Sequence, residues 1–450
     1  MTLDLASGPV SKTLIVFVLP MATANLLQTA YSIVSMMVMG RFVGSTGLTA
    51  VSIGSEIITT LTFVAMGICS AGQIIISQFM GAGDRKSVSR TIGTMFTVML
   101  LTPIVLSVVC IISVNTVLRL LNTPAEAFQM AREYCILCFA GLFFIFGYNM
   151  VSAILRGMGD SRHPLVFIAI ASVSNLILAF IFVAGLGWEA YGAALATVTG
   201  QAISFIASIV LLYKRKEEFG FDFKLRSFKV DGFILRRLMR LGIPLCIQSA
   251  AINLSFMYVN SYIYAYGVVV TAVSSIGSRL GHIMNVVCGS LSTGGGTMVG
   301  QSLGAGRTER VPILIRFSLV VNIVFSLLFS ALIALIPRQL FGLFNSDTEV
   351  LDMAIIYVAP AIVNNIGFAL RAPYFSLING VGHAKLNLAV GLLDGVVGRV
   401  GLALLLGISV GMGVTGFWYG SALAGYIPFI VGVIYYASGK WKTQKLLISR

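Results

Sequence analysis

Long apolar stretches alternate with short polar segments along the whole chain. An α-helix rises about 1.5 Å per residue, so each stretch is long enough to cross the roughly 30 Å hydrocarbon core of a membrane. The predicted fold class is therefore an all-α polytopic membrane protein. Its twelve transmembrane helices are predicted at residues 13–40, 50–79, 90–116, 130–155, 164–186, 190–213, 240–266, 270–303, 313–336, 350–379, 386–408 and 414–438.

Several short motifs occur twice, and the second copy follows the first after 223 residues. Ser52-Ile53-Gly54-Ser55 recurs as Ser275-Ile276-Gly277-Ser278, and the motif Gln78 with Gly81-Ala82-Gly83 recurs as Gln301 with Gly304-Ala305-Gly306. Internal repeats of this length are typical of secondary transporters, which build a central site between related halves. We therefore expect two pseudo-symmetric lobes of six helices each.

A basic segment at 214–239 separates the two copies and is predicted to be a cytoplasmic linker. It divides the chain into an N-lobe at 1–213 and a C-lobe at 240–438, followed by a cytoplasmic tail at 439–450. The composition agrees with a membrane protein, because 57% of the residues are hydrophobic and only 10% are charged. Soluble domains carry about a quarter charged residues.

The net charge of +14 follows the predicted topology. With the amino terminus assigned to the cytoplasm, most of the 30 Lys and Arg fall in cytoplasmic segments, while the outside segments hold Arg41, Arg119, Arg132 and Arg338. This excess of basic residues inside is the usual orientation signal of membrane proteins. Both termini are therefore predicted to be cytoplasmic, with membrane lipids as partners of the basic residues and no nucleic acid.

Signatures of enzymatic chemistry are missing from the sequence. Cys135 and Cys138 have the spacing of a zinc or redox pair, but no second pair or nearby histidine accompanies them, which favours a packing role. No HExxH, Walker or Gly-x-Ser-x-Gly motif occurs. We therefore predict no enzyme activity, no catalytic residue, no metal site and no cofactor.

The glycine motifs occur in an order that resembles a known family. Gln-x-x-Gly-Ala-Gly follows the second and eighth helices, Leu155-Arg156-Gly157-Met158-Gly159-Asp160 ends the fourth, and Tyr191-Gly192-Ala193-Ala194-Leu195-Ala196-Thr197 opens the sixth. Over nearly its whole length the chain resembles the multidrug and toxic compound extrusion (MATE) family, in its prokaryotic DinF-like branch. The resemblance implies two six-helix lobes and export of amphipathic, often cationic compounds in exchange for H⁺ or Na⁺.

The chain departs from this family at residues that many relatives use for ion coupling. Those relatives carry aspartates in the first and fifth helices, where this chain has Ser35 and Ala179. Neither side chain can bind a proton, so the relatives' carboxylate network does not transfer. Ser35 and Asn175 are expected to supply polar contacts to the substrate cavity instead.

Only two of the sixteen acidic residues lie well inside predicted helices, Glu56 and Asp394. A carboxylate within hydrocarbon is costly and usually functional. We predict that Asp394 is the coupling acid and Arg399 its partner, with H⁺ as the coupling ion and Na⁺ as the less favoured one. The alternative is a permanent ion pair with Arg399 or Arg371, although the five-residue spacing from Asp394 to Arg399 predicts different helix faces.

The repeat also relates two opposite charges. Ser55-Glu56 corresponds to Ser278-Arg279, so Glu56 and Arg279 occupy equivalent positions in the two lobes. This arrangement predicts a gate that forms in one transport state and breaks in the other. The alternative is that each residue has a separate partner within its own lobe.

The seventh helix carries aromatic and amide side chains that suit flat, amphipathic molecules. Phe256, Tyr258 and Asn260 are expected to line the substrate cavity, together with Arg371 on the tenth helix. Because arginines are prominent among the charged residues of the predicted interior, an anionic or zwitterionic substrate stays open.

Two prolines lie at corresponding places in the first and seventh helices, Pro20 and Pro244. Proline removes a backbone donor and bends a helix, so both are predicted sites of bending as the lobes reorient. Static kinks are the alternative.

These observations predict a secondary active antiporter that exports amphipathic organic compounds by alternating access of its two lobes. The alternative is a flippase or exporter of lipid-linked or anionic substrates in the same superfamily. The expected partner is a small-molecule substrate, the expected location is the bacterial cytoplasmic (inner) membrane, and the expected state is a monomer.

Overall fold

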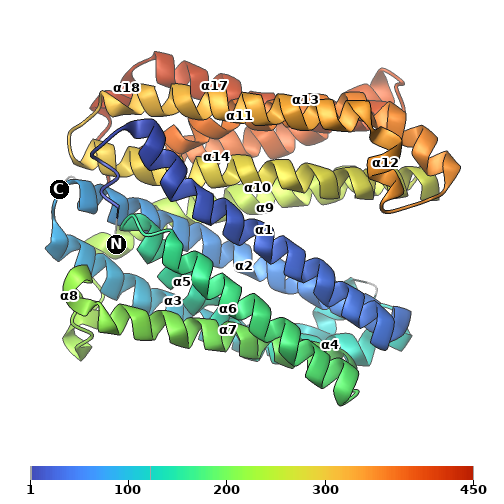
Figure 1. Ribbon diagram of the computed structural model, residues 1–450, viewed down its shortest axis with the longest axis horizontal. Coiled ribbons are helices and arrows are strands. Elements are labelled where there is room, and N and C mark those ends of the chain that lie inside the picture. Colours follow the sequence, from blue (N-terminus) through green and yellow to red (C-terminus); the bar gives the residue numbers. More distant parts are fainter. Residues whose placement is uncertain (1–2, 122, 449–450) are drawn as a thin grey trace. The chain divides into compact units, whose positions relative to one another are not determined.

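The computed structural model describes residues 3–121 and 123–448, so the extreme ends of the predicted N-lobe and tail lie outside the described residues. Within these ranges the chain forms long helices joined by short turns (Figure 1). The first half contains α1 (Val10–Phe42), α2 (Gly44–Gly81), α3 (Arg85–Leu120), α4 (Ala125–Ala140), α5 (Leu142–Gly157), α6 (Arg162–Ala179), the π-helical η1 (Phe180–Gly185), α7 (Glu189–Lys214), α8 (Lys216–Phe219) and the 3-10 turn η2 (Leu225–Phe228).

The second half has the same organisation. It contains α9 (Gly232–Tyr264), α10 (Val268–Gly304), α11 (Arg310–Leu335), α12 (Pro337–Gly342), α13 (Thr348–Val381), α14 (Ala384–Leu392), the π-helical η3 (Leu393–Gly401), α15 (Leu402–Leu404), the π-helical η4 (Leu405–Ser409), α16 (Val414–Ala424), α17 (Tyr426–Ala437) and α18 (Lys440–Thr443). Figure 1 shows α10, α11 and α13 running alongside one another in this half.

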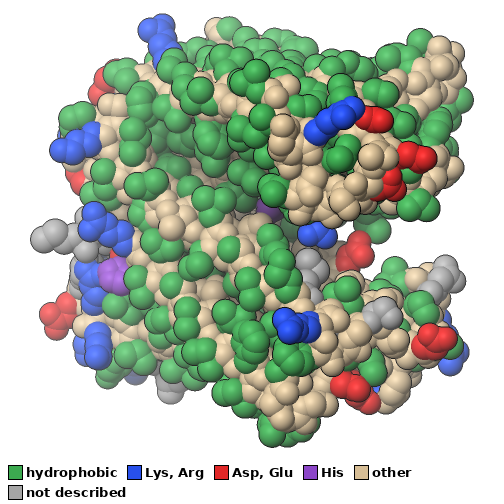
Figure 2. Space-filling view, turned by 45° about the vertical axis from the view of Figure 1, so that its right-hand side comes forward, with side chains coloured by type: hydrophobic (Ala, Val, Ile, Leu, Met, Phe, Trp, Pro, Cys, Tyr) green, Lys and Arg blue, Asp and Glu red, His purple; other side chains and the backbone are tan. Residues whose placement is uncertain are grey.

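The long helical segments of the described residues correspond to the predicted membrane spans. Ten are long and apolar enough to cross a membrane, and the pair α4 and α5, bent by 48°, makes an eleventh. The remaining long helix, α10, has 37 residues, but its many Gly, Ser and Thr residues lower its hydropathy. Figure 2 shows hydrophobic side chains over the flanks of the helices and charged side chains gathered near their ends, as a membrane requires.

Internal packing divides the chain into two compact units. The N-terminal unit contains Leu19–Gly242, and the C-terminal unit contains Asp4–Val18 with Ile243–Arg450. Residues 4–18 belong to the predicted N-lobe, whereas in the structure they pack with the C-terminal unit. The reason is a set of hydrogen bonds to the segment before α1. Arg307 donates to the carbonyl oxygen of Ala6, and Arg310 donates to those of Leu5, Ser7 and Gly8.

The seventh long helix begins earlier than predicted. We expected residue 240, but α9 starts at Gly232, because the Asp231 carboxylate accepts hydrogen bonds from the backbone N–H groups of Phe233 and Ile234. Such a side chain satisfies donors that the first turn of a helix leaves free. The linker between the two repeats is correspondingly shorter than the predicted 214–239.

The rest of the linker packs on α3 through aromatic side chains. The Phe96 ring stacks on Phe221 with 5.8 Å between centroids and meets Phe228 edge-on at 5.6 Å. The Thr97 hydroxyl donates to the Phe228 carbonyl oxygen. The linker is therefore anchored to the N-terminal unit.

The repeated motifs have the same structural roles in both units. A Cβ atom on Gly54 would lie 2.3 Å from the Tyr134 ring, and one on Gly277 would lie 2.2 Å from the Tyr357 ring. Each glycine therefore makes room for the tyrosine that repeats with it, because real Cβ contacts are not this short. The Gly277 and Tyr357 pair matters for function, since both residues line the cavity described below.

The Gly-Ala-Gly motifs end two long helices in the same way. The N–H of Ala82 donates to the Gln78 carbonyl oxygen after α2, and the N–H of Ala305 donates to Gln301 after α10. The next glycine has a φ of +72° in both copies. This left-handed conformation favours glycine and turns the chain toward the following helix.

Candidate functional site

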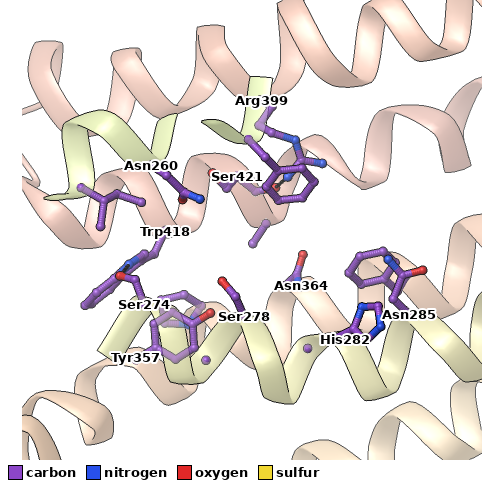
Figure 3. A pocket seen from close by; sticks show the side chains of 17 residues that line it. Asn260, Ser274, Ser278, His282, Asn285, Tyr357, Asn364, Arg399, Trp418 and Ser421 are labelled. Atoms are coloured by element: carbon purple, nitrogen blue, oxygen red, sulfur yellow. Dashed lines mark hydrogen bonds between the residues drawn. The ribbon is translucent and has the colours of Figure 1, made fainter. Parts of the chain in front are cut away.

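The C-terminal unit contains a cavity of about 160 Å³. Residues from α9, α10, α13, η3 and α16 line it. Figure 3 shows Arg399, Asn260 and Ser421 along one side, and Ser278, His282 and Asn285 of α10 along the other. The other lining residues are Ile263, Ser274, Gly277, Gly281, Phe256, Tyr357, Pro360, Asn364, Phe368, Trp418 and Ala422.

The cavity wall combines aromatic rings with neutral hydrogen-bonding groups. The indole Nε1 of Trp418 donates to the Ser274 hydroxyl at 2.9 Å, and the Tyr357 ring packs edge-on against Trp418 at 5.0 Å between centroids. No Asp or Glu is among the lining residues of this cavity in the described chain. Arg399 is the lining residue with a permanent charge.

Behind this wall, the Asp394 carboxylate forms ion pairs with two arginines. Its Oδ1 lies 3.2 Å from Nη2 of Arg399, and its Oδ2 lies 3.1 Å from Nη1 of Arg371. The Asp394 side chain is 0% exposed, against 2% for Arg399 and 15% for Arg371. Because one carboxylate meets two guanidinium groups, this cluster carries a net charge of +1 away from water. We call Arg371, Asp394 and Arg399 the charge cluster.

A local change of helix type brings Asp394 and Arg399 together. The five-residue spacing predicted different faces, and that expectation is wrong for this segment, because η3 (Leu393–Gly401) is a π-helix. A π-helix closes hydrogen bonds from i to i+5, so residues five apart lie on the same side. Short π-helical stretches are frequent at functional sites.

Glycines allow this segment to approach α9 closely. A Cβ atom on Gly395 would lie 2.9 Å from the Ser255 hydroxyl and 3.0 Å from the Ala251 carbonyl oxygen. A Cβ atom on Gly391 would lie 2.3 Å from Gln248. Larger residues at these positions would push η3 away from α9 and displace the charge cluster from the cavity.

Aromatic rings cover both guanidinium groups of the charge cluster. The Cζ atom of Arg399 lies 3.6 Å from the centroid of Phe256, and that of Arg371 lies 4.1 Å from the centroid of Phe368. The face of an aromatic ring attracts a cation, and a planar guanidinium stacks well on it. Phe256 and Phe368 also line the cavity, so they connect the arginines to any molecule bound there.

The hydrogen bonds of Arg399 are incomplete. Nη1 donates to the Ser421 carbonyl oxygen at 3.3 Å and Nη2 donates to Asp394, but Nε is buried without a partner in the described structure. A buried donor without an acceptor costs about 1–3 kcal/mol. Arg399 therefore has unused donor capacity next to the cavity.

Three of the predicted cavity residues on the C-terminal side lie at this site. Phe256 and Asn260 line the cavity, and Arg371 lies behind Phe368. Tyr258 is not among the lining residues, and its hydroxyl lies 3.1 Å from that of Tyr262 on an exposed face of α9. A role for Tyr258 in binding stays a prediction.

The predicted site residues of the N-terminal unit are not among the lining residues of this cavity. Asn175 is buried, and its Nδ2 donates to the Thr197 hydroxyl at 3.0 Å, while Ser35 is half-buried on α1. Glu56 is exposed on α2 in the N-terminal unit, and Arg279 is exposed on α10 in the C-terminal unit. The gate between Glu56 and Arg279 stays a prediction.

The two prolines lie close to where the compact units divide. Pro20 is inside α1, which passes from the C-terminal to the N-terminal unit after Val18, and Pro244 is inside α9, which passes between them after Gly242. Both helices therefore belong partly to each unit. The expected bending at Pro20 and Pro244 stays a prediction.

The polar face of α10 is not among the site residues predicted from the sequence. Ser274, Ser278, His282 and Asn285 are spaced by four, four and three residues, and all four line the cavity. This spacing puts them on one side of a helix, and a search for polar rather than apolar periodicity would have found them. Within the described residues, no group of three or more His, Cys, Asp and Glu is placed to hold a metal ion.

Comparisons with known proteins agree on one family. The MatE family model matches residues 20–181 and 244–397. Two Bacillus subtilis proteins are similar over much of their length. The probable multidrug resistance protein YoeA is 30% identical over 76% of this chain and 75% of its own, and the probable multidrug resistance protein YpnP is 27% identical over 99% of both.

Solved structures show the same fold. One, described as the outward-facing conformation of a multidrug resistance MATE family transporter, matches with a TM-score of 0.91 at 20% identity, over 99% of this chain and 98% of that chain. Another, a MOP superfamily transporter from Pyrococcus furiosus described as having a binding pocket of reverse polarity, also has a TM-score of 0.91 at 20% identity, over 98% of both chains. The predicted all-α fold with twelve helices in two lobes is confirmed.

Proposed function

Because this chain belongs to the MATE family of multi-pass membrane transporters, we propose that it is a secondary active antiporter that exports amphipathic organic compounds in exchange for H⁺. Relatives of this chain are described as multidrug resistance proteins, which supports an export role. We place the protein in a bacterial inner membrane, as a monomer with both termini in the cytoplasm.

One observation carries the proposal of proton coupling. Asp394 is a fully buried carboxylate that contacts Arg399, and Arg399 lines the cavity. Protonation of Asp394 removes its attraction for Arg399 and leaves the guanidinium free to move. A proton on Asp394 and a substrate in the cavity therefore influence each other through a single side chain.

The net charge of the charge cluster determines whether protonation of Asp394 weakens or strengthens substrate binding. The cluster carries +1 when Asp394 is ionised and +2 when it is protonated. The added positive charge repels a cation in the cavity, so protonation of Asp394 weakens the binding of a cationic substrate. A cationic substrate therefore binds better to the ionised form, and the proton and the substrate exclude each other, as exchange requires. A neutral substrate is excluded sterically when the released Arg399 moves into the cavity.

The cavity suits part of an organic molecule with a flat ring. An apolar cavity of about 150 Å³ holds a benzene-sized molecule, and this cavity has about 160 Å³. Phe256, Tyr357 and Trp418 supply aromatic faces for stacking, and Asn260 and Asn364 supply hydrogen bonds. Larger substrates would place one ring here and extend beyond the cavity.

A second candidate function has its own supporting observation. The net charge of +1 at the charge cluster favours an anionic or lipid-linked substrate. For an anion the sign of coupling reverses, because protonation of Asp394 would strengthen binding. The pH dependence of substrate binding separates the two functions.

The proposal is tested by efflux of a fluorescent cationic dye from proteoliposomes. We expect dye efflux under an imposed pH gradient and none under a Na⁺ gradient at equal pH. Efflux driven only by Na⁺ would contradict H⁺ as the coupling ion. Dye movement under neither gradient, combined with transport of an anionic amphiphile, would replace the proposal with the second candidate.

A further inference from the structure

Arg399 presents unsatisfied positive charge to a cavity that contains no acid. Its guanidinium group has five N–H donors. The structure shows one bonded to the Ser421 carbonyl oxygen and one to Asp394, while Nε has no partner and the side chain is 2% exposed. The cavity in front of it has no Asp or Glu among its described lining residues.

This arrangement is costly unless a negative charge completes it. Asp394 neutralises one of its two arginines, so one positive charge stays uncompensated in a buried setting. Charges within a membrane protein are normally paired or hydrogen-bonded. An anion beside Arg399 would compensate the charge and accept the free N–H bonds at the same time.

We propose that the cavity binds a small monovalent inorganic anion, of halide size, against Arg399, and that this anion binds together with the proton on Asp394. Neutral donors are placed to complete the site. Figure 3 shows Asn260 and Ser421 on the same side as Arg399, and Asn364 across from them. Amide and hydroxyl groups donate to anions without adding charge.

For a neutral substrate, the anion also balances the charge of the transport cycle. Protonation of Asp394 raises the charge of the cluster from +1 to +2, and a monovalent anion returns it to +1. That is the charge of the ionised cluster with a neutral substrate in the cavity. The two loaded states then carry equal charge across the membrane, so the potential favours neither of them. The anion occupies the substrate's space, which strengthens the exclusion of substrate from the protonated form.

The pH dependence of anion binding has to be attributed to one of the titratable groups near Asp394. On α9, the neighbours Ala251 and Ser255 do not titrate. The titratable side chains that line the cavity are His282, Tyr357 and Arg399. Cys288 packs in one core cluster with Ala369 and Ala372, which flank Arg371 in the sequence. The helices that pack against η3 carry Lys385, Tyr419 and Tyr426. His282 lines the cavity, and histidine ordinarily changes charge between about pH 5 and 8. A His282→Gln variant is therefore the necessary control.

Anion binding is measured by broadening of the ³⁵Cl NMR line of sodium chloride by the purified protein in detergent, without any transport assay. We expect binding at about pH 5.5 to exceed that at about pH 8 by about tenfold, because one added unit charge acts at close range. Asp394→Asn should bind chloride tightly at both pH values. His282→Gln should keep the pH dependence, and Arg399→Gln should lose binding.

Several results would overturn the proposal. No protein-dependent broadening in the wild type at either pH would do so, as would equal broadening by Arg399→Gln and the wild type. If chloride binding loses its pH dependence in His282→Gln, the titrating group is His282 and not Asp394. Binding of an amphipathic carboxylate that depends on Arg399 and that chloride does not weaken would assign Arg399 to an organic substrate. A misfolded Arg399→Gln protein would also lose chloride binding. The test still stands, because Asp394→Asn is expected to gain chloride binding, and misfolding does not produce a gain.

A transport arm separates this inference from the proposed function. In proteoliposomes, proton-driven efflux of a neutral amphipathic dye should slow severalfold when chloride is replaced by gluconate. Efflux that is equal in both salts would overturn the role of the anion in the cycle while leaving the antiporter intact. Chloride binding without any efflux would leave the site in place and reject the antiporter.

Discussion

Asp394→Asn is expected to abolish proton-driven efflux. Arg371 and Arg399 contact different oxygens of Asp394. Asparagine keeps only one oxygen, which replaces the acceptor for one of the two arginines, and it cannot gain or lose a proton. The variant should therefore fall to the rate of protein-free liposomes under a pH gradient. Exchange of internal labelled dye for external unlabelled dye needs no proton. It should nevertheless weaken, because the neutral residue holds the charge cluster at +2 and so disfavours a cation in the cavity.

The matched control is Asp352→Asn. Asp352 pairs with Arg338 at 2.5 Å, and both side chains are largely exposed. The same chemical change there removes an ion pair whose residues do not line the cavity. This variant should retain proton-driven efflux. Proton-driven efflux by Asp394→Asn at the wild-type rate would reduce Asp394 to a structural role. Loss of chloride binding by the purified variant as well would indicate a general defect.

The second large effect is a difference in stability between two variants of the charge cluster, Asp394→Leu and Arg399→Leu. Asp394→Leu leaves two buried guanidinium groups without a carboxylate, and removing one partner of a buried ion pair costs about 3–5 kcal/mol. Arg399→Leu leaves Asp394 paired with Arg371, so we expect a smaller loss of about 1–3 kcal/mol. Thermal unfolding of the purified variants in detergent measures the order.

A double variant checks the physical reason for this order. If the cost of Asp394→Leu comes from unpaired arginines, then adding Arg399→Leu should recover part of the lost stability. Neighbouring residues in one network are expected to be non-additive in this way. Strictly additive losses, or a larger loss for Arg399→Leu than for Asp394→Leu, would mean that packing rather than charge determines stability at this site.

Sequence periodicity was sufficient for the fold because membrane spans are long and repeats are specific. Gly54 and Tyr134 repeat as Gly277 and Tyr357, and the structure shows each glycine making space for its tyrosine. The start of α9 was placed too late, since the capping carboxylate of Asp231 lies in a basic linker that has no apolar pattern.

The site was only partly predictable. Asp394 was found because acids are rare in apolar helices, and Phe256 and Asn260 because they are conspicuous on α9. The contact of Asp394 with Arg399 depends on the π-helical η3, and helix periodicity contains no signal for that local change. The packing of residues 4–18 with the C-terminal unit depends on hydrogen bonds to backbone carbonyls, which side-chain patterns do not encode.

Proton release on substrate binding tests the central claim most directly. Purified wild-type protein in weakly buffered detergent is mixed with a cationic substrate between about pH 5 and 8, and the protons released are measured with a pH indicator. Because substrate favours the ionised form, linkage requires release, rising toward about one proton per substrate where ligand-free Asp394 is protonated. Asp394→Asn should release none. Proton uptake by the wild type, or equal release by Asp394→Asn, would contradict exchange through Asp394.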